Sequence, residues 1–184
     1  IGVGGYFSTV DGTYQYGFAV LTATGARDAS FAVGANLSNS VNALALAAGD
    51  RLLVGGRFTS EGGVAAGGLV AYSSITGTSV ARTAAGFRSL GSVYAAIPLR
   101  DNKWMVGGYF SFVNGVSRTS LVRINADGTV DPSFDAGSLF NNNVQALVEQ
   151  GDGKLLVAAW QNTYGHLLRL NADGTRDSSF SVGT

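Results

Sequence analysis

The sequence contains no cysteine and little charge, and both absences narrow the classes of protein to which it can belong. Without cysteine, disulfides and thiolate metal sites are excluded. Only 13% of the residues are charged, and 12 basic and 12 acidic residues give a formal net charge of zero. A basic stripe that would attract nucleic acid is therefore missing. No apolar run approaches the roughly 20 residues of a membrane-spanning helix, so membrane insertion is not expected.

Histidine and glutamate are also scarce, which limits the possible catalytic groups. His166 is the single histidine, and Glu61 and Glu149 are the only glutamates. A lone histidine supplies at most one metal ligand, and no serine and carboxylate stand at a recognisable triad spacing from it. A glycosidase needs two carboxyl groups at a set separation across a sugar. Glu149 with Asp101 or Asp152 leaves a carbohydrate-active enzyme open as an alternative to a protein without catalytic activity.

Glycine, in contrast, is abundant and periodic. There are 27 glycines, and Gly-Gly pairs begin at Gly4, Gly55 and Gly107, with Ala158 in the fourth place. The spacings are 51, 52 and 51 residues. A fixed period of this size is typical of propellers, solenoids and arrays. The period predicts four repeat units within one domain: unit one (residues 1–40), unit two (41–92), unit three (93–143) and unit four (144–184).

Within each unit, short apolar runs alternate with clusters of glycine, aspartate, asparagine and serine, which predicts strands joined by tight turns. Asp152-Gly153 is a strong turn signal because glycine accepts a positive φ. No segment has the apolar period of a helix. We expect an all-β chain and specifically a β-propeller with four-stranded blades. The first blade lacks its first strand, and further repeats or other protomers would complete the ring. A parallel β-helix is the structural alternative.

The small and aromatic residues of the repeat fit this architecture. A missing Cβ in the Gly-Gly pairs would let backbone or a ring approach closely. The rings expected there are Phe7, Phe58 and Phe110, with Trp160 near the equivalent place in unit four. One phenylalanine closes each unit, and these are expected to plug the spaces between blades: Phe31, Phe87, Phe134 and Phe180.

The motifs of residues 144–156 and 121–134 resemble the delta-60 repeat, a bacterial β-propeller family. The resemblance covers essentially the whole chain and is weakest in unit two, at residues 71–77. It implies a setting in secreted, cell-surface or phage-associated proteins with longer arrays, and it implies no catalytic motif. The resulting hypothesis is a non-enzymatic structural and binding module of an extracellular or virion assembly. A bacterial surface protein or a phage tail or fibre would be its parent, and a glycan or protein receptor its partner.

One repeated polar motif could bind a cation. Its side chains alternate along the chain and are Asn125, Asp127 and Asp131 in unit three and Asn171, Asp173 and Asp177 in unit four. Ca²⁺ takes six to eight oxygen ligands, but the glycine position and final glutamate of an EF-hand are absent. A hairpin turn in which Asp and Asn side chains bond their own backbone is the favoured interpretation, so no cofactor is expected.

A partner would be expected to contact the stretches that differ most between units. These are residues 8–16, 34–40, 59–66, 111–117, 137–143 and 161–165. Loops carry binding residues because the strands are occupied by packing. The leading candidates are Tyr14, Tyr16, Phe140, Asn142 and Tyr164.

Overall fold

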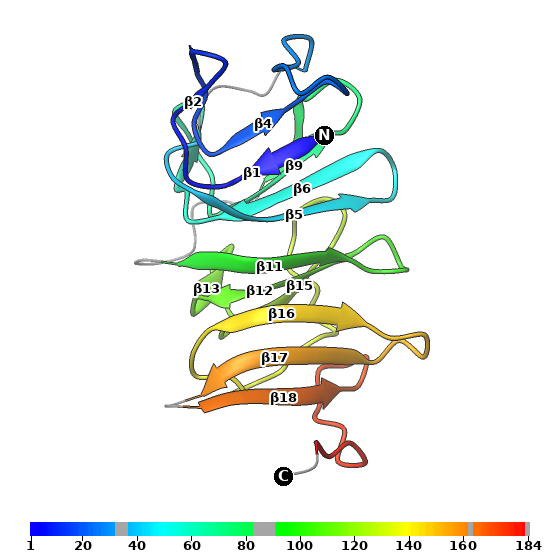
Figure 1. The fold of residues 1–184 in the computed structure, drawn as a ribbon. Helices are drawn as coiled ribbons and strands as arrows, with labels where there is room; N and C mark the ends of the chain where they lie inside the picture. Colours follow the sequence, from blue (N-terminus) through cyan, green and yellow to red (C-terminus); the bar gives the residue numbers. More distant parts are fainter. Residues whose placement is uncertain (32–36, 83–90, 162–163, 183–184) are drawn as a thin grey trace.

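The computed structural model describes residues 1–31, 37–82, 91–161 and 164–182, and all regular structure in these ranges is β-strand. The prediction of an all-β chain is confirmed. Every strand pair within the sheets is antiparallel, which excludes the parallel β-helix. The sheets are stacked from unit one at one end to unit four at the other (Figure 1). Phe87 lies outside the described residues.

Unit two has the four strands that the repeat predicts. They run in the order β10-β9-β6-β5 across one sheet. Their bounds are β5 (Val41–Ala47), β6 (Arg51–Gly56), β9 (Leu69–Ser73) and β10 (Ser79–Arg82). The turn between β5 and β6 has positive φ at Gly49 and Asp50, 71° and 54°, so the expected tight connection is present.

The other three units depart from the prediction of four strands. Their strands are β1 (Gly2–Gly4) and β4 (Phe18–Val20) in unit one, β11 (Ser92–Pro98), β12 (Trp104–Tyr109) and β15 (Leu121–Ile124) in unit three, and β16 (Val144–Glu149), β17 (Leu155–Gln161) and β18 (Tyr164–Leu170) in unit four. In place of the fourth strand each has one isolated bridge, such as Ile124 with Val130. The strand stops there because the carboxylate of the next residue, Asp131, accepts a hydrogen bond from the Ser133 backbone N–H and turns the chain. Unit two has Val80 at this position and continues as a strand.

Short hairpins follow the Gly-Gly strand in units one to three, where only loops were expected. Their strands are β2 (Thr9–Val10) and β3 (Thr13–Tyr14), β7 (Ser60–Glu61) and β8 (Val64–Ala65), and β13 (Phe112–Val113) and β14 (Val116–Ser117). In the third hairpin Asn114 and Gly115 have φ values of 50° and 79°. Positive φ at both central residues is the type I′ geometry that Asn-Gly favours, so the sequence did contain a signal for this hairpin.

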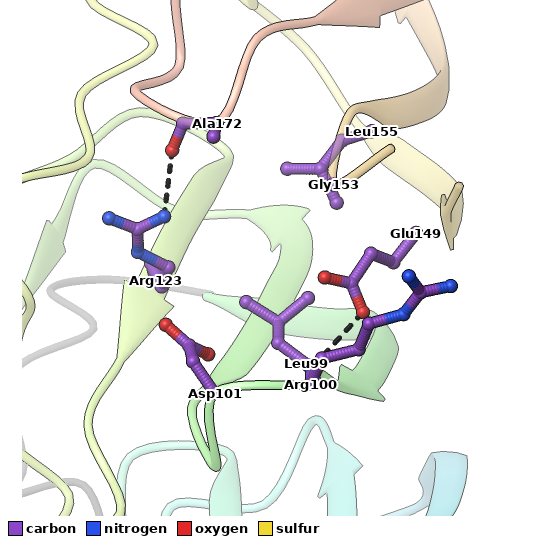
Figure 2. Close-up of a pocket in the computed structure, with 8 residues that line it drawn as sticks. All are labelled: Leu99, Arg100, Asp101, Arg123, Glu149, Gly153, Leu155 and Ala172. Carbon is purple, nitrogen blue, oxygen red and sulfur yellow. Dashed lines mark hydrogen bonds between the residues drawn. The ribbon is translucent and has the colours of Figure 1, made fainter. Parts of the chain in front are cut away.

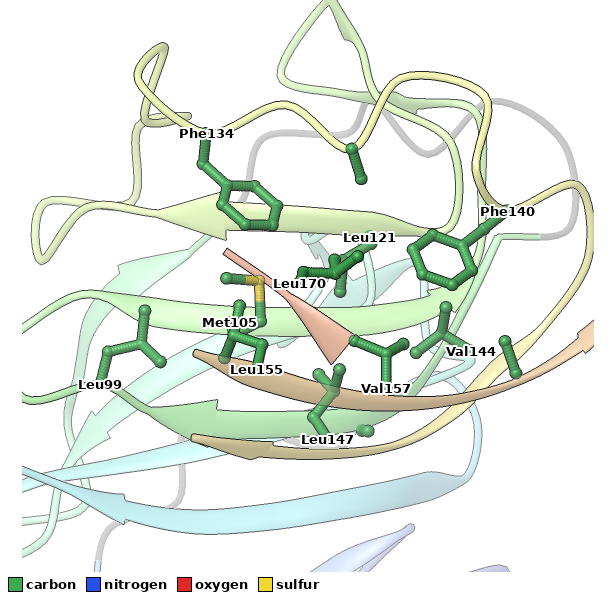
Figure 3. Packing of buried hydrophobic residues seen from close by; sticks show 13 residues of the cluster. Leu99, Met105, Leu121, Phe134, Phe140, Val144, Leu147, Leu155, Val157 and Leu170 are labelled. Atoms are coloured by element: carbon green, nitrogen blue, oxygen red, sulfur yellow. The ribbon is translucent and has the colours of Figure 1, made fainter. Parts of the chain in front are cut away.

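Apolar clusters between successive units form the core. The first strand of each later unit packs on the first two strands of the unit before it, β11 on β5 and β6, and β16 on β11 and β12. Figure 3 shows the cluster between units three and four, in which Met105, Phe134 and Leu147 are buried together. Burial of one such side chain contributes roughly 1.5–3 kcal/mol. These contacts hold the sheets together as a stack.

The Gly-Gly pairs lie where units touch, but rings are not what crowds them in units two and three. A Cβ on Gly107 would lie 2.4 Å from Cγ1 of Val144, and one on Gly55 would lie 2.6 Å from Cγ1 of Val93. A Cβ on the second glycine, Gly108, would lie 2.0 Å from the Ser92 carbonyl oxygen. The predicted approach of Phe58 and Phe110 was therefore wrong, because the valine of the next unit and the backbone occupy that space.

The stack does not close on itself in the described residues. Unit one and unit four lie at opposite ends (Figure 1), and the strong strand contacts are confined to neighbouring units. The described part of the chain has no helix with the length and apolarity of a membrane span.

Candidate functional site

The Asp-Gly motifs of units three and four are hydrogen-bonded turns. Asp127 Oδ1 accepts bonds from the backbone N–H of Thr129 at 2.9 Å and from its hydroxyl at 2.7 Å. Asn125 donates from its side-chain amide to the same hydroxyl at 3.0 Å. Unit four repeats these bonds with Asn171, Asp173 and Thr175 at 2.9, 2.9 and 2.7 Å. The bonds to Thr129 lower the pKa of the Asp127 carboxyl. The hairpin-turn interpretation accounts for all of these contacts.

The last aspartate of each motif joins three segments of its unit through an ionic cluster. Asp131 Oδ2 accepts bonds from Lys103 Nζ at 2.8 Å and Arg123 Nε at 2.7 Å. Burial by itself would raise the pKa of Asp131, but the bonds from Lys103, Ser133 and Arg123 outweigh it and hold that pKa well below its usual range. The Arg123 guanidinium also lies 5.1 Å from the centre of the Phe134 ring. The carboxylate therefore connects the residue before β12, strand β15 and the segment that follows β15.

Unit four contains the same cluster in the equivalent positions. Asp177 Oδ2 accepts bonds from Lys154 Nζ and Arg169 Nε, both at 2.7 Å. The bond from Lys154, followed by those from Ser179, lowers the pKa of Asp177. Arg169 lies 4.8 Å from the ring centre of Phe180. The repetition indicates a structural role for both aspartates.

These clusters bear on the calcium hypothesis. Lys103 and Arg123 already neutralise Asp131, and Lys154 and Arg169 neutralise Asp177. Two cations beside a carboxylate oppose the binding of a third. Within the described ranges, no group of three or more His, Cys, Asp or Glu side chains is placed to hold a metal ion. The candidate calcium ligands are thus engaged in turns and ion pairs.

The five candidate contact residues are not brought together. Tyr14 is exposed on β3 in unit one, and Tyr164 is exposed at the start of β18 in unit four. Tyr16 lies edge-on to Tyr6, with ring centres 6.0 Å apart, and a hydrogen bond with Tyr6 raises the pKa of Tyr16. Asn142 is half-buried, and its side-chain oxygen accepts a bond from the Asn143 backbone N–H. Tyr14 and Tyr164 therefore belong to opposite ends of the stack.

Phe140 was wrongly predicted as a contact residue. Its side chain is fully buried in the cluster between units three and four (Figure 3). Exposure was predicted because Phe140 lies in a loop that varies between units. Burying its apolar ring between the two units stabilises the fold, because it removes apolar surface from water. Residues 34–36 and 162–163 of the predicted contact stretches lie outside the described residues.

A charged pocket lies beside the turns that join the first strand to the second strand in units three and four, β11 to β12 and β16 to β17. Its volume is about 250 Å³ and it opens between units three and four (Figure 2). Asp101 and Glu149, named above as acids of a possible glycosidase, both line it. Glu149 Oε2 accepts a bond from the Arg100 backbone N–H at 3.2 Å. The structure therefore unites two of the three suggested acids.

Two arginines of this pocket were missed by sequence reasoning. Arg100 Nη1 donates to the Gly151 carbonyl at 2.7 Å, and Arg123 Nη1 donates to the Ala172 carbonyl at 2.7 Å. Both bonds cross from unit three to unit four. Arg51 of unit two bonds the Ala126 carbonyl of unit three in a similar way. Most of the pocket's positive charge is thus engaged in joining units.

Unit two contains a buried carboxylate at a position where unit three has a valine. Glu61 is 4% exposed, at the position that the 52-residue spacing aligns with Val113. Its Oε2 lies 3.5 Å from Arg82 Nη2. Burial, then the charge of Glu61, raises the pKa of the neighbouring Tyr72. The sequence reasoning placed Glu61 in a loop, although its alignment with a valine was a signal for burial.

Comparison with known families agrees with the repeat architecture. The family model described as "Domain of unknown function (DUF5122) beta-propeller" matches residues 99–134 and 150–180. Units three and four are therefore similar to β-propeller repeats. Each matched stretch includes one complete ionic cluster, from the turn before its lysine to the closing phenylalanine. No curated protein matches the chain.

The fold class is an all-β one of β-propeller type. The match supports a propeller repeat, and the antiparallel sheets stacked through their faces agree with it. Over the described residues the blades form an open stack. The family description assigns no activity, so function follows only from the residues themselves.

Proposed function

We propose that the chain is a non-enzymatic structural and binding module, built from repeats of the delta-60 type. In this proposal it belongs to an extracellular, cell-surface or virion assembly, such as a bacterial surface protein or a phage tail or fibre. It would attach to a glycan or to a protein receptor, with no role for nucleic acid, a membrane or a cofactor.

The main support is that the repeated charged side chains of units three and four bond one another. Asp131 and Asp177 each accept bonds from a lysine and an arginine of their own unit. A carboxyl group that acts as a general acid or base must reach the substrate and works best with a pKa near the working pH. These two are held by cations and have lowered pKa values, which suits a scaffold. The exposed rings of Tyr14 and Tyr164 offer the apolar faces on which sugars or side chains stack.

A glycan array probed with the intact protein tests this proposal. We expect binding of a subset of glycans without turnover of any, and loss of that binding in Tyr14→Ala or Tyr164→Ala. Ile75→Ala is the matched control, because Ile75 is comparably exposed but lies in a turn of unit two. Unchanged binding in both tyrosine variants would remove the assignment of the contact residues.

The alternative function is a carbohydrate-active enzyme. One observation favours it, since Asp101 and Glu149 line one pocket. Both acids already have partners within the protein, because Glu149 accepts a bond from the Arg100 backbone and Asp101 lies 3.4 Å from Lys103 Nζ. Release of reducing sugar from any array glycan, abolished by Glu149→Gln, would replace the binding module with this enzyme.

A further inference from the structure

The outer face of unit four, the side of its sheet turned away from unit three, is apolar. Five apolar side chains of this face lie on β16, β17 and β18 and are half-buried or exposed: Ala146, Val148, Leu156, Ala158 and Leu167. Val148 is 55% exposed and Leu167 is 39% exposed. A contiguous apolar surface on a sheet is costly in water and marks an interaction site.

Unit three has the same face, and there it is covered. The residues in the equivalent register are Ala95, Ile97, Met105, Gly107 and Leu121. Leu121 is 1% exposed, against 39% for its counterpart Leu167. The cover is the first strand of unit four, β16, whose Val144 and Leu147 belong to the same buried cluster (Figure 3). Unit two presents its own version of the face to Val93 of unit three in the same way.

An arginine hydrogen bond crosses to the next unit beside the covered faces of units two and three. Arg123 of unit three donates from Nη1 to the carbonyl of Ala172 in the next unit. Arg51 of unit two reaches Ala126 in the next unit. Arg169 stands in unit four where Arg123 stands in unit three. Its Nε and Nη2 bond Asp177 and Ser179, while its Nη1 has no bonding partner among the residues that the structure describes.

On this face, unit four has an alanine where units two and three have a glycine. Gly55 and Gly107 each receive a valine from the next unit, and Ala158 takes their place. A Cβ on Gly107 would lie 2.4 Å from Cγ1 of Val144 and 3.1 Å from its Cβ. A valine docked in this register on Ala158 would therefore overlap its methyl group, whereas alanine would need a shift of only a few tenths of an ångström and glycine would have no side chain to meet it.

We infer that the outer face of unit four is a docking surface for one further blade of this repeat type, whose first strand begins with glycine or alanine where Val41, Val93 and Val144 stand. Leu156 and Leu167 bind its apolar inner face. Arg169 Nη1 donates to the backbone carbonyl of its Asp-Gly hairpin, as Arg123 does for unit four. Ala158 selects the blade by the size of one residue.

The test uses the full chain with one blade added. A copy of residues 139–143 and then of residues 93–143 is joined after Thr184, which reproduces the spacing between Phe134 and Val144. Three versions have valine, alanine or glycine at the first position of the added strand. With alanine or glycine, we expect amide exchange in β17 and β18 to slow by roughly tenfold relative to the unextended chain. With valine, we expect little slowing.

Ala158→Gly provides the reciprocal variant. It should restore slow exchange to the valine version and leave the glycine version unchanged. Equal protection of β17 by all three versions in the Ala158 background would overturn the size selection. Failure of every version, including valine on Ala158→Gly, would overturn the docking surface itself.

If a second copy of the chain occupied this face instead of a further blade, the unextended chain would form a dimer. If the unextended chain forms a concentration-dependent dimer that Leu167→Glu abolishes, the face belongs to a second copy and the proposal fails. A monomer at all concentrations, with exchange in β17 faster than in β12, is the expected result.

Discussion

The residue on which the first strand of the next unit packs is a glycine in units two and three, and the equivalent residue of unit four is an alanine, larger by one methyl group. At Gly55 and Gly107 the missing Cβ makes room for Val93 and Val144 of the next unit, since a Cβ there would lie only 2.6 and 2.4 Å from the nearest valine carbons. Neither glycine has a positive φ, so backbone freedom does not explain them. They are glycines because of what packs against them.

Gly107→Val should therefore lower the melting temperature, whereas Ala158→Val should barely change it. Overpacking at a full junction costs about 1–3 kcal/mol, which corresponds to a fall of roughly 3–10 °C for a chain of this size. Ala158 is half-buried at the equivalent position, and no described strand covers it. Thermal unfolding followed by circular dichroism measures both. Equal losses in the two variants would contradict the packing explanation.

The residues predicted best are those that the period repeats. The Gly-Gly pairs, the Asp-Gly turns and the burial of Phe134 follow from equivalent positions in successive units. Phe140 was mispredicted because loop variation was taken as exposure, although its ring packs between units. Val144 as the neighbour of Gly107 could not be predicted either, because the repeat period describes the spacing of units along the chain and not their contacts in space.

At the scale of elements, an ionic cluster replaces a long fourth strand. In units three and four the chain makes one bridge after the Asp-Gly turn and then anchors Asp131 or Asp177 to strands two and three through a lysine and an arginine. Unit two has no such aspartate and instead pairs β10 along β9. The segment after the third strand is thus held by side-chain bonds to an aspartate in units three and four, and by backbone hydrogen bonds between β9 and β10 in unit two.

The sequence indicated the turns of this region but not their partners. Asp127-Gly128 predicted the hairpin, and the fourth strand was then extended by analogy with a full blade. A propensity argument cannot show that Lys103, 28 residues away from Asp131 in the sequence, donates to it at 2.8 Å. That contact depends on the register of β12 with β15, which tertiary packing determines.

These clusters should make stability fall in acid. The pKa values of Asp131 and Asp177 are lowered on folding, so their contribution is fully present above the unfolded value of about 3.9 and is lost as the pH falls further. We expect the melting temperature to be nearly constant from about pH 6 to 8 and to decrease below about pH 4.

The double variant Asp131→Asn with Asp177→Asn tests the cause of that decrease. It should melt lower than the parent at neutral pH and lose part of the acid dependence, since the two carboxylates that titrate are gone. Asp50→Asn is the control, because Asp50 is an exposed turn residue outside both clusters. A parent-like acid slope in the double variant would assign the dependence to other groups.

On the scale of the whole molecule, the units form a line in which each contacts its neighbours. Such an arrangement makes stability a sum of unit and junction contributions, so position in the stack matters. Among the residues that the structure describes, unit three packs against both neighbours and unit four against one. Unit one contributes a two-stranded sheet and packs on unit two.

Hydrogen exchange should therefore be graded along the stack. We expect the amides of β12 to exchange most slowly, those of β17 faster, and those of β1 fastest, because protection follows the burial of the sheet and its neighbours. Mass spectrometry of peptic fragments from the intact chain measures all three at once. Met105→Ala, which removes a fully buried side chain from the junction of units three and four, should accelerate exchange in β17 more than in β6, since β6 lies beyond an undisturbed junction. Uniform protection in every unit, with uniform acceleration by Met105→Ala, would mean that the stack unfolds as one cooperative body instead of by units.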